Sequence, residues 1–134
     1  MHITKAHIPA IGWTLFIASS CLLPAAAFKN IEFILFGLDK LAHLVLYLAF
    51  VILWALSIPG EFTKGLKTKL AATSIGYGVL IEILQSAMSL GRSYDMDDII
   101  ANTAGCMLGL FCISFIKRKM PLLKNRLPFL RHLY

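Results

Sequence analysis

Eight polar side chains that could hold a proton, an anion or a metal ion are scattered through a strongly apolar chain. They carry carboxylate, imidazole, amide or guanidinium groups and are Asp39, His43, Glu82, Gln85, Arg92, Asp95, Asp98 and Asn102. Ionisable groups inside a lipid bilayer are costly, so they usually mark a functional site. The residues therefore indicate a site, although their types leave its substrate open.

The first group lies on one predicted helix. Asp39, His43 and Tyr47 recur every four residues and so share one stripe. Asp39 could accept a proton from His43 or hold its tautomer, which makes both candidate catalytic residues. The alternative is an aspartate that caps the helix beside a histidine anchored at the lipid interface.

The second group is Glu82 with Gln85, three residues apart and therefore on one helical face. An ionised Glu82 should face a partner inside the bundle, or else be protonated, and is a candidate general acid. Alternatively, the two side chains only join helices by hydrogen bonds.

The third group occupies one face at the start of the last apolar segment. That face carries Asp95, Asp98, Asn102, Gly105 and Gly109. Glycines at this spacing allow two helices to approach closely. Arg92 precedes them, and its planar guanidinium suits a carboxylate or a phosphate.

Three interpretations of these acids compete. Asp95, Asp97 and Asp98 could bind a divalent cation, although the run lacks the glycine and distant glutamate of an EF-hand loop. They could cap the last helix. They could also form a network with Arg92 and Glu82 that lines a site. The network is our preferred interpretation, and no metal or other cofactor is expected.

The elements that must position these groups are predicted to be membrane helices in one domain, residues 1–134. Of the 134 residues, 58% are hydrophobic, which exceeds the roughly 45–50% of soluble domains. The apolar residues form four blocks, 10–28, 41–58, 70–87 and 99–116, each near the length that spans a bilayer. The sequence predicts an all-α polytopic protein with four transmembrane helices in an antiparallel bundle.

The orientation follows from the basic residues. With four spans, ten of the 13 Lys and Arg residues fall on one side, and Lys29, Lys40 and Arg92 fall on the other. The positive-inside rule then places both termini in the cytoplasm and the polar site at the outer face. No nucleic-acid motif accompanies the net charge of +6, so nucleic acid is not an expected partner.

The two ends of the chain need separate interpretation. Pro24 and the three alanines after it resemble a signal-peptidase site, but we expect a retained helix that Pro24 kinks. The tail, residues 117–134, mixes cations with apolar residues, as in an amphipathic segment on the inner leaflet. Pro121 and Pro128 argue against one unbroken helix there.

Three stretches resemble the VanZ family of small bacterial membrane proteins. They are Asp39-Lys-Leu-Ala-His43-Leu-Val-Leu-Tyr47, Glu82-Ile-Leu-Gln85 and Gly91-Arg-Ser-Tyr-Asp95-Met-Asp-Asp98-Ile-Ile-Ala-Asn102-Thr-Ala-Gly105. The resemblance covers roughly residues 37–112 and leaves out the first span and the tail. The family's namesake is associated with resistance to teicoplanin, a lipid-tailed glycopeptide. The resemblance implies a protein of the bacterial inner membrane and cell envelope, with the eight polar residues at motif positions.

Three functions remain open. The first is a binder of a lipid or glycolipid headgroup, with Arg92, Asp95, Asp98, Asn102, Gln85 and Tyr47 as ligand-binding residues. The second is an intramembrane hydrolase or transferase, with His43, Asp39 and Glu82 as catalytic candidates. The third is a structural subunit of a membrane complex. The glycines would also suit a homodimer, although packing within one chain explains them equally well.

Overall fold

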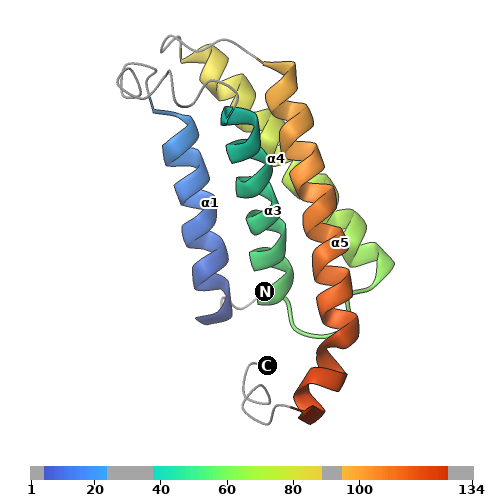
Figure 1. The fold of residues 1–134 in the computed structure, drawn as a ribbon. Coiled ribbons are helices and arrows are strands. Elements are labelled where there is room, and N and C mark those ends of the chain that lie inside the picture. The colour runs from blue at the N-terminus through green and yellow to red at the C-terminus, as the bar shows by residue number, and fades with distance from the viewer. Residues whose placement is uncertain (1–4, 24–37, 89–94, 127–134) are drawn as a thin grey trace.

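The computed structural model describes residues 5–23, 38–88 and 95–126. For residues 120–126 it describes the helical backbone but not the side chains. The described part of the chain contains four α-helices and no strand: α1 (Ile8–Cys21), α3 (Asp39–Ser57), α4 (Lys64–Ala87) and α5 (Met96–Arg126). A 3-10 turn at Lys5–His7 precedes α1. Successive helices run in opposite directions (Figure 1). The prediction of an all-α antiparallel bundle is therefore confirmed.

Three of the helices have the length and composition of membrane spans. These are α3, α4 and the part of α5 from Met96 to Lys119. Helix α1 has 14 residues and rises about 21 Å, less than the roughly 30 Å of a hydrocarbon core. The structure thus supports three of the four predicted spans. Pro24 and the alanines of the possible cleavage site lie outside the described residues.

Several helix boundaries differ from the sequence prediction, among them the end of α1, which is Cys21 and not residue 28. Helix α4 begins six residues early because Thr63 caps it, with its hydroxyl accepting a 3.3 Å hydrogen bond from the Leu66 amide. Helix α5 continues through Pro121 to Arg126, so Pro121 does not break the helix as expected, whereas Pro128 lies outside the described residues. A proline removes one backbone donor and can kink a helix, but a long helix can continue through it.

Helices α3 and α5 make the most extensive contact of the bundle. A Cβ atom at Gly105 would overlap the carbonyl oxygen of Leu44. A Cβ atom at Gly109 would lie 2.8 Å from the carbonyl oxygen of Leu48 and 3.0 Å from Cβ of Val51. The predicted role of these glycines in close helix contact is therefore confirmed.

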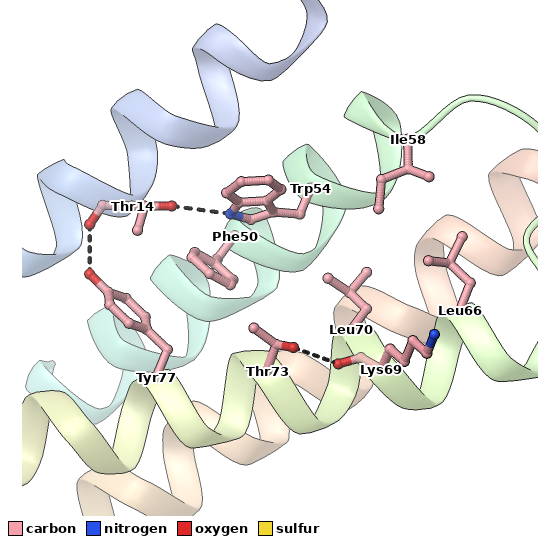
Figure 2. Close-up of a pocket in the computed structure, with 9 residues that line it drawn as sticks. All are labelled: Thr14, Phe50, Trp54, Ile58, Leu66, Lys69, Leu70, Thr73 and Tyr77. Atoms are coloured by element: carbon pink, nitrogen blue, oxygen red, sulfur yellow. Dashed lines mark hydrogen bonds between the residues drawn. The ribbon is translucent and has the colours of Figure 1, made fainter. Parts of the chain in front are cut away.

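Hydrogen bonds from α3 and α4 to Thr14 attach helix α1 to the bundle. The Trp54 indole of α3 donates to the Thr14 hydroxyl at 3.1 Å, and the Tyr77 hydroxyl of α4 donates to the Thr14 carbonyl at 2.7 Å (Figure 2). Between these three helices lies an apolar cleft of about 310 Å³, which Phe50 and Leu70 also line (Figure 2).

Apart from Lys40, the lysines and arginines in the described part of the chain gather at one end of the bundle. Helix α1 and helix α4 begin at this end and α5 ends there (Figure 1). Lys117 donates a 3.1 Å hydrogen bond to the carbonyl of Ile58, and its ammonium lies 5.2 Å from the ring centre of Phe62. The ammonium of Lys67 lies 5.4 Å from the same ring. The acidic residues of α3 and α5 lie at the opposite end.

Substitution of Gly105 by alanine should weaken the bundle. The added methyl group would meet the α3 backbone, which cannot rotate away, so the free energy of unfolding should fall by about 1–3 kcal/mol. Unfolding in mixed detergent micelles measures the change. Gly76→Ala is the matched control, since a Cβ atom there meets nothing within 4 Å. Equal stability of the two variants would contradict the close α3–α5 contact.

Candidate functional site

The polar residues of three helices meet at one end of the bundle. This is the end at which α3 and α5 begin and α4 ends (Figure 1). His43 of α3, Glu82 of α4, and Asp98 and Asn102 of α5 are all buried there. We call these four residues the polar cluster. The sequence had placed them near one another only by helical period and topology.

Lys40 is the cation of this site within the described part of the chain. Its ammonium lies 2.5 Å from Oδ2 of Asp95, 2.5 Å from Oδ1 of Asp98 and 3.4 Å from Oδ2 of Asp39. The Lys40 side chain is 33% exposed, so it forms a rim above the buried cluster. Sequence reasoning missed Lys40 as a site residue. Its position three residues before His43, and so on the same face, was the available signal.

Asp95 has two structural roles. Its Oδ2 pairs with Lys40, and its Oδ1 accepts a 2.8 Å hydrogen bond from the amide of Asp97. The hydrogen bond from Lys40, followed by that from the Asp97 amide, holds the pKa of Asp95 below its usual value. Asp95 therefore caps the start of α5 as an ionised carboxylate, as one sequence interpretation had proposed.

His43 faces α5. Its Nδ1 lies 3.0 Å from Oδ1 of Asn102, and its Nε2 lies 3.7 Å from Oδ2 of Asp98. With the amide oxygen as acceptor, Nδ1 carries the proton and Nε2 is directed to Asp98.

In the described part of the chain, His43 and Asp39 do not pair with each other, so the expected interaction between them is wrong. Asp39 instead accepts from the backbone amide of Lys40 at 2.9 Å and contacts its ammonium. Asp39 lies at the exposed start of α3, whereas the His43 ring reaches across to α5.

Glu82 completes the polar cluster from α4. It is fully buried, and one ligand atom each from Glu82, His43 and Asp98 lie within 4.8 Å of one another. An imidazole between two carboxylates can exchange protons or hold a metal ion. This trio differs from the Asp95, Asp97 and Asp98 set considered from the sequence, in which Asp97 is exposed.

Tyr47 and Asn102 pack against a glycine of α4. A Cβ atom at Gly78 would lie 3.3 Å from Cε1 of Tyr47 and 3.3 Å from both Cβ and Nδ2 of Asn102. The Tyr47 ring also lies 6.3 Å, centre to centre, from that of Tyr77. Its hydroxyl is buried and makes no hydrogen bond to the residues described. Sequence reasoning did not single out Gly78, because no spacing pattern distinguished it from the other glycines of this helix.

Gln85 joins two helices. Its buried amide donates a 2.6 Å hydrogen bond to the carbonyl of Cys21, in the last turn of α1. Carbonyls in the last turn of a helix have no partner within the helix, so this bond satisfies one of them. Gln85 thus matches the helix-joining interpretation. Arg92, the expected cation, lies outside the described residues, as does Gly91.

A family model described as VanZ/LLP1 matches residues 5–117. The match covers most of the chain and begins before α1, so it includes the first apolar segment that the motif resemblance had left out. No curated protein and no solved structure matches the chain significantly.

Replacement of Lys40 by methionine should destabilise the polar end. Asp98 would remain buried without its cation, at a cost of about 1–3 kcal/mol, between the values of exposed and buried ion pairs. Asp98→Asn in the same chain should restore part of the loss, which a double-mutant cycle of unfolding free energies measures. Purely additive effects of the two substitutions would show that the pair is not coupled.

Proposed function

The chain belongs to the VanZ/LLP1 family and is a VanZ-like membrane protein, and we propose that its polar end binds the headgroup of a lipid or glycolipid. The observation that carries the proposal is the position of Lys40, whose partly exposed side chain forms the rim above buried hydrogen-bonding groups. A charged group at the end of membrane-spanning helices is at the depth of lipid headgroups.

The chemistry of the rim supports a ligand that carries both an anion and polar groups. Lys40, together with Arg92 three residues before Asp95 in the sequence, would meet a phosphate. The carboxylates of Asp39 and Asp95, which are 44% and 42% exposed, would meet hydroxyl groups or an amine. A phospholipid or a lipid-linked sugar carries these groups together.

The distribution of charge supports an outward-facing site. Apart from Lys40, the lysines and arginines of the described residues gather at the end opposite the polar cluster, among them Lys64, Lys67 and Lys69 at the start of α4. By the positive-inside rule, that end would lie in the cytoplasm together with both termini. The protein would then act at the outer leaflet of a bacterial inner membrane, where a lipid-tailed glycopeptide or a cell-wall precursor is also found. A link to glycopeptide resistance is part of this proposal.

A second candidate function is an intramembrane hydrolase or transferase. The convergence of His43, Glu82 and Asp98 favours it, because a base and an acid would lie beside a headgroup bound at the rim. His43→Ala should then abolish turnover of a bound lipid and spare its binding. In a pure binder, the same substitution would change affinity alone.

Native mass spectrometry of the protein, released from its membrane in mild detergent, tests headgroup binding. Wild type should carry a phospholipid or a lipid-linked species, and Lys40→Gln and Arg92→Ala should lose it because each removes a cation for the phosphate. Lys64→Gln is the matched control, since Lys64 is an exposed lysine at the opposite end. Lipid-free wild type, or equal lipid occupancy in all variants, would refute the proposal.

A further inference from the structure

The three groups that converge from α3, α4 and α5 have the composition of a metal site. We propose that His43, Glu82 and Asp98 bind a divalent transition-metal ion, with Zn²⁺ as the probe. The ion would occupy the interior of the proposed headgroup site. Metal binding itself requires no lipid, so the two proposals can fail separately.

The distances between the donor atoms fit a shared ion. One ligand atom of each residue lies within 4.8 Å of the other two. His43 Nε2 and Asp98 Oδ2 are 3.7 Å apart, which is too long for a hydrogen bond. Ligands bound at about 2.1 Å to a common zinc ion stand roughly 3–4 Å from one another. Small side-chain movements would therefore bring the three donors around one ion.

Neighbouring residues orient two of the three ligands. Metal-bound histidines usually donate their other ring N–H to an oxygen, which fixes the ring and its tautomer. Asn102 Oδ1 lies 3.0 Å from Nδ1 of His43 and would accept that proton, leaving Nε2 for the metal. Lys40 holds Oδ1 of Asp98 at 2.5 Å, which leaves Oδ2 on the side of His43.

The chemical types of the three ligand atoms also favour one class of metal ion. One imidazole nitrogen with two carboxylates suits a transition metal better than Mg²⁺ or Ca²⁺, which prefer oxygen ligands alone. Glu82 and Asp98 are both buried, and neighbouring carboxylates repel each other, so a dication between them would offset both charges. Three protein ligands leave a position open. If the headgroup proposal holds, a phosphate oxygen would fit there.

Titration of Zn²⁺ into protein stripped with a chelator and freed of any histidine tag tests the site. Wild type should bind one ion per chain by calorimetry, and His43→Gln, Glu82→Gln or Asp98→Asn should weaken binding by more than the roughly 10- to 100-fold loss typical of a removed outer-shell partner. Asn102→Leu should weaken it about 10- to 100-fold through the lost orientation of His43. Asp97→Asn is the matched control, an exposed acid next to Asp98.

X-ray absorption at the zinc edge keeps the proposal testable where a variant fails to fold. The bound ion in wild type should have one imidazole in an otherwise oxygen shell, whereas sulfur or several imidazoles would overturn the assignment. Absence of zinc binding in wild type, or equal binding in every variant, would overturn it too. Lipid retained without zinc would refute the metal site alone, and zinc bound without any lipid would refute headgroup binding alone.

Discussion

The close approach of α3 and α5 is the constraint on which the polar end depends. Where Gly105 meets the carbonyl of Leu44, the two backbones are in contact without a side chain between them. His43 precedes Leu44, and Asn102 lies three residues before Gly105, so the same contact brings the imidazole within 3.0 Å of the amide. A larger residue at 105 would separate the helices and, with them, the groups that orient His43.

The buried polar groups serve two purposes, and the hydrogen-bond partners of each group show which purpose it serves. Gln85 and Trp13 donate to backbone carbonyls of other helices, at 2.6 Å to Cys21 and 2.9 Å to Leu46, and so hold α1 in place. Single hydrogen bonds of this kind are a common means of joining membrane helices. The polar cluster is different, because it brings ionisable side chains of three helices together. Helix packing alone does not require that arrangement, which is costly in lipid.

The sequence predicted the features that depend on the periodic spacing of residues along a single helix. The stripe of α3, the shared face of Asp98, Asn102 and Gly105, and the helix-joining role open to Gln85 could all be read from spacing. The predictions that failed concerned contacts between side chains, which depend on how one helix is rotated against another. Asp39 and His43 share a stripe, yet His43 turns to α5 and Asp39 to Lys40. The long Lys40 side chain reaches acids more than 50 residues away in sequence. Spacing within one helix cannot predict a contact between residues so far apart in the sequence.

An aromatic layer determines how a ligand could reach the polar cluster. Tyr47 lies one turn below His43 on α3, and its ring lies 6.0 Å from that of Phe50 and 6.3 Å from that of Tyr77. Phe50 and Tyr77 stack at 5.3 Å and also line the apolar cleft between α1, α3 and α4 (Figure 2). The rings therefore lie between the cleft and the cluster. Because the rim at Lys40 is partly exposed while the groups beneath it are buried, a polar ligand would enter past Lys40, from the ends of the helices.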